Sequence, residues 1–145
     1  MINIICLGKI KERYLNELIE DYKLRISKYH KINIIELVDT NDLDKEEVNI
    51  LKYIKPNDYV ISLAIEGKEL NSSELSKTIE NIFNNYGTID FIIGSSNGLS
   101  SNIKNKSNML LSFSKLTYPH GLFRGILLEQ IYRSFKIMNN ESYHK

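Results

Sequence analysis

The sequence predicts a single α/β domain built on a mostly parallel β-sheet. Five short runs of β-branched and apolar residues recur along the chain, and amphipathic stretches lie between most of them. Alternating strands and helices are typical of this fold class. The length of 145 residues, with 42% hydrophobic and 26% charged residues, suits one domain over residues 1–145, and no repeat or linker divides it.

The first two predicted strands flank a long amphipathic helix. Ile2–Leu7 is a short apolar run and is expected to form the first strand. Apolar residues then recur at helical spacing over Lys11–Tyr29, which predicts a helix with one apolar face. Ile32–Val38 is rich in β-branched residues and predicts the second strand.

The middle of the chain begins with an acidic segment, DTNDLDKEE, which is followed by a short helix through Ile50, Leu51 and Ile54. The sequence KPND then predicts a turn, because Pro fixes its own φ and Asn and Asp favour turns. Tyr59–Ile65 is the third expected strand.

One further helix and two strands complete the expected sheet. Ser72 or Ser73 is expected to cap a helix that runs to about Asn85. Ile89–Ile93 predicts the fourth strand, and Met109–Phe113 predicts the fifth.

The last predicted helix, Gly121–Met138, is apolar on more than one side. A helix that is hydrophobic nearly all round has to be buried. One face can pack on the sheet, and the remainder is expected to contact a second subunit. Glu129 and Arg133 lie four residues apart in this helix and could simply pair with each other.

Three loops are candidate positions for chemistry, because ligands bind beyond the carboxyl ends of the strands in open α/β sheets. They follow Ile65, Ile93 and Phe113. The first contains EGKE and is typical of an ordinary turn. The second, FIIGSSNGLS, contains Gly94 and Gly98, whose backbone can approach a ligand closely. It has neither the P-loop nor the G-x-G-x-x-G spacing, so alone it is weak evidence for a nucleotide-like ligand.

The third loop, LSFSKLTYPHGLFRG, alternates hydroxyl side chains with Phe113 and Leu116. Pro119 ends this extended run and biases Tyr118 toward an extended backbone. Exposed backbone amides and carbonyls beside apolar side chains suit an adenine ring. Such a ring needs hydrogen bonds along its edge and apolar contacts on its faces.

Composition argues against several classes of protein. No apolar run approaches the roughly 20 residues of a membrane span, and the first run is too short for a signal peptide. Cys6 is the single cysteine, so no intrachain disulfide can form, and it is expected to be buried in a strand. These features predict a cytoplasmic protein. No spacing indicates a metal site or a hydrolytic triad. His30 is expected on the surface, and His120 could be a structural hydrogen-bonding residue.

The charge distribution is uneven, although the net charge is only +1. Residues 104–145 carry seven Lys or Arg against two Glu, so the rest of the chain is net acidic. A positive C-terminal part suggests that phosphate or a polyanion binds there. A chance gradient of solvated charges explains the pattern equally well.

Four ordered motifs, FIIGSSNGLS, LSFSKLTYPH, LLEQIYRSFKI and the final YHK, resemble the RlmH family of SPOUT methyltransferases, and the resemblance extends over the whole chain. It implies a mostly parallel sheet with helices on both faces and a C-terminal trefoil knot. It also implies S-adenosylmethionine as methyl donor and a homodimer. The implied reaction methylates N3 of a pseudouridine in bacterial 23S ribosomal RNA, within the large subunit or the whole ribosome.

The resemblance also assigns site residues. Tyr143 would stack on the RNA base, and His144 would be the candidate base or orienting acceptor for the imide proton. Lys145, with Arg124 or Arg133, would hold phosphate or stabilise the imidate oxygen. The implied cofactor-binding residues are Leu63, Gly94, Phe113, Ser114, Lys115, Leu116, Thr117 and Tyr118.

The chain departs from the family pattern at a few positions. Members commonly carry paired glycines where this chain has Gly94 and Ser95, so a hydroxymethyl group must fit there. Gly121 and Gly125 stand in the last helix where larger residues are usual, at a cost of roughly 1 kcal/mol each in helix propensity. The acidic segment over residues 39–47 is also short.

Two other classes of function fit the residues. A nucleotide-binding regulator would use the glycine loop without catalysis and would not need His144. A dimeric assembly factor would bind ribosomal RNA through its basic end, independently of S-adenosylmethionine. The modest net charge argues against a strong nonspecific RNA binder, because phosphate contacts supply most of such affinity. An assembled ribosomal particle is therefore the expected RNA substrate.

Overall fold

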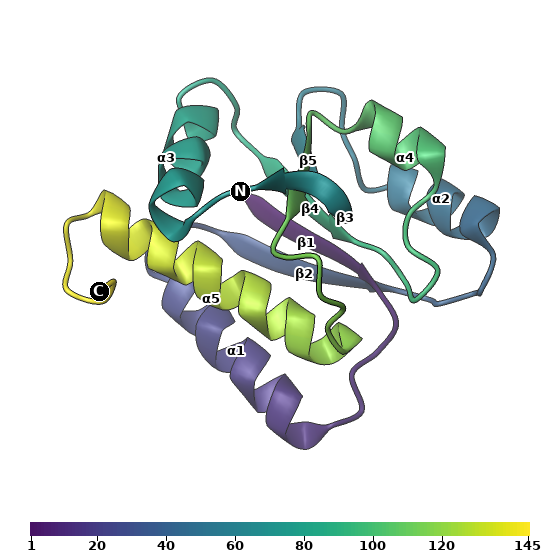
Figure 1. Ribbon diagram of the computed structural model, residues 1–145, viewed down its shortest axis with the longest axis horizontal. Helices are drawn as coiled ribbons and strands as arrows, with labels where there is room; N and C mark the ends of the chain where they lie inside the picture. The colour runs from purple at the N-terminus through teal and green to yellow at the C-terminus, as the bar shows by residue number, and fades with distance from the viewer.

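Five parallel strands form one sheet in the order β2-β1-β4-β3-β5, which confirms the predicted α/β class (Figure 1). The computed structural model describes residues 1–145. The strands are β1 (Ile2–Leu7), β2 (Ile32–Leu37), β3 (Tyr59–Glu69), β4 (Ile89–Ile93) and β5 (Met109–Ser112). The helices are α1 (Arg13–Ser27), α2 (Leu43–Leu51), α3 (Ser72–Phe83), α4 (Ser101–Lys106) and α5 (His120–Met138).

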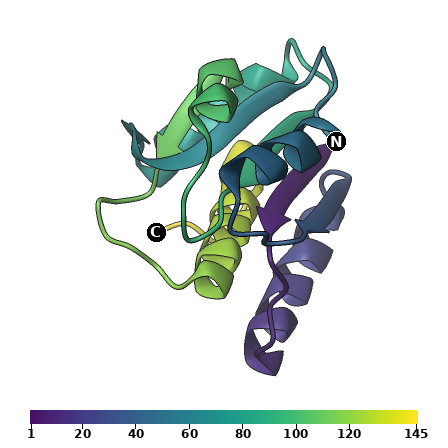
Figure 2. The same ribbon diagram turned by 90° about the vertical axis from the view of Figure 1, so that its right-hand side faces the viewer.

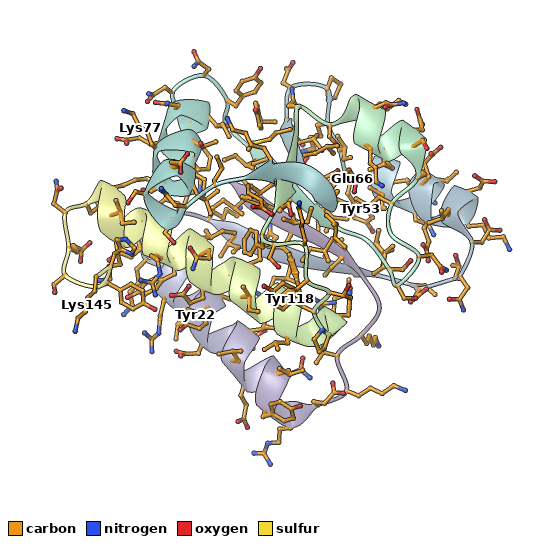
Figure 3. The ribbon with its side chains drawn as sticks, viewed as in Figure 1. Tyr22, Tyr53, Glu66, Lys77, Tyr118 and Lys145 are labelled. Atoms are coloured by element: carbon orange, nitrogen blue, oxygen red, sulfur yellow. The ribbon has the colours of Figure 1, made fainter.

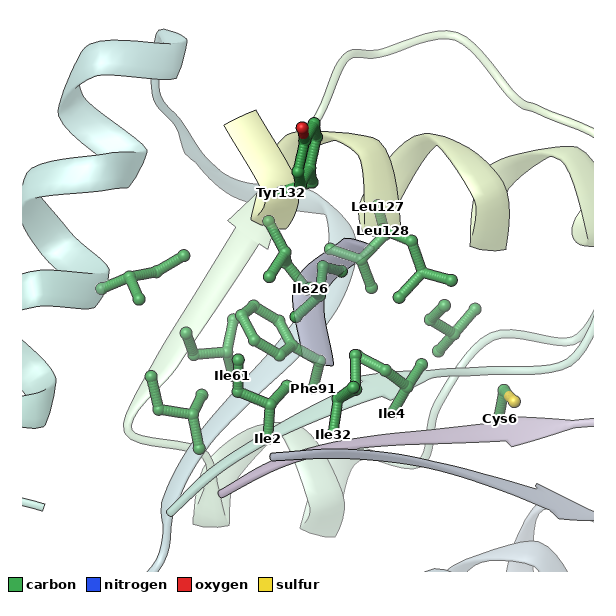
Figure 4. Packing of buried hydrophobic residues seen from close by; sticks show 14 of the residues in the cluster. Ile2, Ile4, Cys6, Ile26, Ile32, Ile61, Phe91, Leu127, Leu128 and Tyr132 are labelled. Carbon is green, nitrogen blue, oxygen red and sulfur yellow. The ribbon is translucent and has the colours of Figure 1, made fainter. Parts of the chain in front are cut away.

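Helices cover both faces of the sheet, as predicted (Figures 1 and 2). Side chains alternate along a strand, so β1 supplies Ile2 and Ile4 to one core and Ile5 and Leu7 to the other. The larger core lies under α1, α3 and α5 (Figure 4), and the smaller one lies under α2 and α4. Burial on both faces explains why the strands are nearly continuous apolar runs.

The two glycines of α5 allow this helix to lie close to α1. A Cβ atom on Gly121 would lie 2.9 Å from Cδ1 of Leu15, and one on Gly125 would lie 2.8 Å from Cδ2 of Leu18. Both distances are shorter than a normal contact between carbon atoms. The cost of glycine in helix propensity is therefore offset by close packing of the two helices.

The third strand is longer than the sequence predicted. β3 continues to Glu69, and its register with β5 shifts between Leu63 and Lys68, where it forms a bulge. A Cβ atom on Gly67 would lie 2.7 Å from the carbonyl carbon of Leu110. The prediction of an ordinary turn here was wrong, because this glycine permits close approach of two strand backbones.

One helix was not predicted, and the capping residue of another differs from the prediction. The short helix α4 was not predicted; Ser100 caps it by accepting a hydrogen bond from the N–H of Ile103, at 3.2 Å. The cap of α3 is Asn71, not either of the two serines that follow it. Asn71 and Glu74 accept hydrogen bonds from each other's backbone N–H groups in a capping box.

Of two predictions about single residues, one is confirmed and one is wrong. Cys6 is fully buried, as predicted, and burial raises the pKa of its thiol to about 11. His30 is not a freely solvated surface residue, because its ring stacks on Phe83 with 4.3 Å between ring centroids. Partial burial also lowers the pKa of His30.

Helix α5 lies between α1 and α3, which cover part of the apolar surface that the sequence assigned to a second subunit. At its start, Leu122 is still 37% exposed. No helix is both long enough and apolar enough to span a lipid bilayer. The trefoil knot stays a prediction.

Candidate functional site

A cavity of about 600 Å³ opens at the carboxyl ends of β1, β4 and β5, beside the bulge of β3. Cavities of this size bind small molecules or cofactors, and this position is where α/β sheets bind ligands. Two of the three predicted loops, those after Ile93 and Phe113, meet here. In place of the loop predicted after Ile65, the bulged part of β3 lines the cavity with Ala64, Ile65 and Glu66.

Most of the predicted cofactor residues line this cavity. They are Leu63, Gly94, Phe113, Ser114, Leu116, Thr117 and Tyr118. Lys115 is exposed and does not line the cavity, so the structure does not bring it together with the other residues.

The loop after β4 is a tight turn that depends on glycine at two positions. A Cβ atom on Gly94 would lie 2.5 Å from the carbonyl oxygen of Gly98, which leaves no room for a side chain. Gly98 has a φ of +78°, which favours glycine. Its N–H donates a hydrogen bond to the carbonyl oxygen of Ser95, at 2.8 Å. The turn therefore presents bare backbone to the cavity.

The loop after β5 forms an aromatic and hydroxyl-rich wall. Ser114 Oγ accepts a hydrogen bond from the N–H of Leu116 at 2.8 Å and lies 3.2 Å from the hydroxyl of Tyr118. The rings of Phe113 and Tyr118 both contact Phe123 of α5, with centroids 5.3 and 5.7 Å away. Phe123 thus supports the wall, a role that the sequence analysis did not assign.

Charged residues that the sequence analysis missed also line the cavity. Glu66 Oε1 accepts from Lys104 Nζ at 2.7 Å, and this pairing lowers the pKa of Glu66. Lys9 and Asp39 line the cavity from the loops after β1 and β2. The sequence signal for the first of these loops was Gly8, directly after the first strand, which has a φ of +90°.

Arg124 is buried in this chain, which does not support its predicted role in RNA binding. Its side chain is 1% exposed and pairs with Oε2 of Glu36 at 2.6 Å. Its second terminal nitrogen donates to the carbonyl oxygen of Gly8 at 3.0 Å and to Nε2 of His120 at 3.1 Å. Arg124 therefore ties the start of α5 to β2 and to the end of β1.

His120 lines the cavity as a neutral imidazole. A guanidinium group only donates hydrogen bonds, so Nε2 of His120 accepts the one from Arg124. Burial, and then the charge of Arg124, lowers the pKa of His120. The prediction of a structural hydrogen-bonding role is confirmed.

The C-terminal residues fold back onto the end of α5. Glu129 Oε1 accepts hydrogen bonds from the Tyr143 hydroxyl at 2.9 Å and from Arg133 Nε at 3.0 Å, so the predicted pairing of Glu129 with Arg133 is confirmed. Burial, and then hydrogen bonding, raises the pKa of Tyr143, which keeps it a donor. Arg133 also donates to Nδ1 of His144 at 3.1 Å, which places the proton of the neutral ring on Nε2. Lys145 is exposed.

The cavity and the C-terminal residues lie at opposite ends of α5. The cavity is lined by His120 and Phe123 at the start of this helix, and Tyr143 and His144 follow its end. Nineteen helical residues span about 27 Å. Figure 3 shows Lys145 far from Tyr118. Within one chain, therefore, Tyr143 and His144 do not reach the cavity. No three His, Cys, Asp or Glu side chains lie close enough together to hold a metal ion.

Comparisons with known proteins agree on one family. Residues 1–144 match the family model described as "Predicted SPOUT methyltransferase". A Fusobacterium nucleatum protein named "Ribosomal RNA large subunit methyltransferase H" is 50% identical over 153 residues, with 99% of each chain covered. A Clostridium botulinum protein of the same name is 47% identical over 157 residues, again with 99% of each chain covered.

Solved structures share the fold at low sequence identity. A probable methylase family protein from Haemophilus influenzae aligns with 99% of this chain and 70% of its own, with a TM-score of 0.59 and 14% identity. The SpoU methyltransferase AviRb from Streptomyces viridochromogenes aligns with 98% of this chain and 62% of its own, with a TM-score of 0.52 and 9% identity.

Proposed function

Since this chain belongs to the SPOUT methyltransferase family, we propose that it methylates N3 of a pseudouridine in 23S ribosomal RNA. The protein is a methyltransferase, and its cofactor is S-adenosylmethionine. Relatives named as methyltransferases of large-subunit ribosomal RNA support the choice of RNA substrate. The observation that carries the proposal is the cavity at the carboxyl ends of the strands, with its bare glycine turn beside an aromatic wall.

The residues around the cavity fit this cofactor. Gly94 lets the turn close tightly on the Gly98 carbonyl, so that the backbone of this turn lines the cavity. Phe113 and Leu116 offer apolar contacts for the faces of an adenine ring, and neighbouring backbone groups can pair with its edge. Asp39 supplies negative charge that complements a cationic ligand, whereas the charge of Glu66 is already paired with Lys104. When bound, S-adenosylmethionine supplies a methyl group on a positively charged sulfur, open to direct attack by a nitrogen.

The distance between the cavity and the C-terminal residues favours a homodimer. A chain whose own Tyr143 and His144 cannot reach its cavity needs them from a second copy. In a symmetric dimer each chain would give its C-terminal residues to the cavity of the other. The exposed Leu122 and the apolar start of α5 lie beside the cavity and suit such an interface.

His144 is the proposed group that takes or orients the imide proton of the acceptor base. A neutral imidazole is suited to this task near neutral pH. Because Arg133 occupies Nδ1, the imidazole can accept a proton only after that contact opens. An RNA phosphate that attracts Arg133 and Lys145 would open it. Tyr143, whose hydroxyl is held by Glu129, presents its ring for stacking on the base.

The proposal is tested by mixing two inactive variants. His144→Ala removes the imidazole of the C-terminal segment, and Gly94→Ala distorts the glycine turn that lines the cavity. Each variant alone should transfer no labelled methyl group to ribosomes that lack the modification. After subunit exchange, half of the dimers pair one chain of each kind and contain one intact site, so activity should return to about one quarter of the wild-type value. No recovery, despite exchange shown by mass spectrometry, would contradict shared sites.

The RNA target is tested with the wild-type protein. Mapping of the methyl group by mass spectrometry should place it on N3 of a pseudouridine in 23S ribosomal RNA. Ribosomal particles should be methylated faster than naked RNA fragments, since the modest net charge limits nonspecific binding. Equal rates on both substrates would contradict the need for an assembled particle.

A further inference from the structure

The buried carboxylate of Glu46 connects two loops that line the cavity. Glu46 is 2% exposed, and Oε1 accepts a hydrogen bond from Ser95 Oγ at 3.0 Å. Oε2 accepts one from the backbone N–H of Thr40, also at 3.0 Å. Thr40 belongs to the loop between β2 and α2, and Ser95 belongs to the glycine loop, here residues 94–100. A single side chain of α2 therefore holds both loops.

The next residue of α2 holds the other end of the glycine loop. Glu47 Oε1 accepts a hydrogen bond from Ser100 Oγ at 2.5 Å. This bond is the main reason why the pKa of Glu47 is lowered. Ser100 Oγ in turn accepts from the N–H of Ile103 and caps α4. The two serines at the ends of the loop thus meet two consecutive glutamates.

Ser95 also accepts two hydrogen bonds from the backbone of the turn. Its Oγ accepts a hydrogen bond from the N–H of Asn97 at 3.3 Å, and its carbonyl oxygen accepts from Gly98 at 2.8 Å. A glycine at position 95 could make only the second of these contacts. The hydroxyl of Ser95 is therefore the link between the buried carboxylate and the backbone that faces the cavity.

We propose that Glu46 and Glu47 are positioning residues, which fix the shape of the glycine loop for cofactor binding through Ser95 and Ser100. This inference rests on the proposed function of the cavity. Hydrogen bonds to carboxylates are stronger than those between neutral groups, so they restrict a loop that is rich in glycine. A loop held in its bound shape loses less conformational freedom when the ligand binds, which increases affinity.

The first test measures binding of S-adenosylhomocysteine, the demethylated product, by isothermal titration calorimetry. Ser95→Ala and Ser100→Ala should each weaken binding about five- to tenfold, since each removes a hydrogen bond to a carboxylate. The matched control is Ser101→Ala, because Ser101 is exposed in the first turn of α4 and should leave affinity unchanged. Melting temperatures are measured for every variant to confirm that each is folded.

The second test separates positioning from a general structural role. Glu46→Ala should weaken binding about tenfold, but it should add little to Ser95→Ala, because both changes break the same contact. Glu46→Gln should restore most of the affinity. Its oxygen can accept from Thr40 while its NH₂ group donates to Ser95 Oγ.

The outcomes distinguish a failure of this inference from a failure of the proposed function. Wild-type affinity in both serine variants would overturn the inference, and so would fully additive losses for Glu46→Ala and Ser95→Ala. Failure of the wild-type protein to bind S-adenosylhomocysteine would instead contradict the proposed function of the cavity.

Discussion

Replacing Asp90 by Asn is expected to stabilise the protein above neutral pH. Asp90 lies in β4, at the end of the sheet away from the cavity, and is fully buried. Its Oδ1 accepts a hydrogen bond from Asn3 at 2.9 Å, but its Oδ2 has no partner. Burial, and then the neighbouring Asp58, raises the pKa of Asp90 to about 7, although the hydrogen bond from Asn3 and the charge of Lys55 oppose this.

The effect of Asp90→Asn on the free energy of unfolding depends on the difference between the pKa of Asp90 in the folded and the unfolded chain. Below pH 3.8, the ordinary value, Asp90 is protonated in both states and has no effect on the pH dependence of stability. As the pH rises toward 7, the unfolded chain releases this proton while the folded chain keeps it, so stability falls. Three pKa units correspond to about 4 kcal/mol, an upper bound that is reached above the folded pKa. An asparagine resembles the neutral acid and removes this loss.

The assay is urea denaturation of the wild type and Asp90→Asn between about pH 4 and pH 8. The difference in free energy of unfolding should be near zero at the acidic end and should rise to a few kcal/mol in favour of the variant at the basic end. Asp58→Asn is the control, and it should reduce the pH dependence only in part, because burial is the larger cause. A difference that stays constant over this range would refute the reasoning.

Three further predictions concern packing and access. Gly94→Ala should abolish binding of S-adenosylhomocysteine, measured by calorimetry, while the circular dichroism spectrum stays native. The reason is that the new Cβ would lie 2.5 Å from the carbonyl oxygen of Gly98 and would distort the turn. Retained binding would contradict this geometry. Gly125→Val should lower the free energy of unfolding by about 1–3 kcal/mol in urea, because its Cβ would press on Leu18; an unchanged value would mean that α1 moves away freely. Cys6 should not react with a thiol reagent at about pH 8 until the protein is unfolded, since burial raises the pKa of its thiol to about 11; rapid labelling of the folded protein would contradict this.

The spacing of apolar residues predicted the strands and the helices that are long enough for such a pattern to be recognised. Apolar runs gave all five strands, and helical spacing gave α1, α3 and α5 to within a few residues. Helix α4 has only six residues, too few for a period to be recognised. The extension of β3 past Ile65 depends on pairing with β5, a contact between distant parts of the chain. Its local sequence, with Gly67 among charged residues, is typical of a turn.

Charge in a sequence does not distinguish a buried cation from an exposed one. Arg124 was assigned to RNA as one of the cations that the family resemblance implied, yet it is buried against Glu36. One signal could have corrected this. Arg124 lies four and seven residues before Leu128 and Ile131, so it shares the inward face of α5 with two fully buried side chains. A cation on such a face needs a buried partner, and the partner came from β2, 88 residues away in sequence.

Ser95 and Glu46 are also far apart in the sequence, 49 residues, so the sequence alone does not show that Ser95 and the acidic segment are related departures from the family pattern. In the fold, Glu46 lies against Ser95 and needs it, because a buried carboxylate requires donors at both oxygens. With glycine at position 95, Oε1 would lose its only side-chain donor inside the protein. The serine and the glutamate therefore compensate each other, and the glycine turn of this chain is held by a side-chain contact that a chain with paired glycines cannot make.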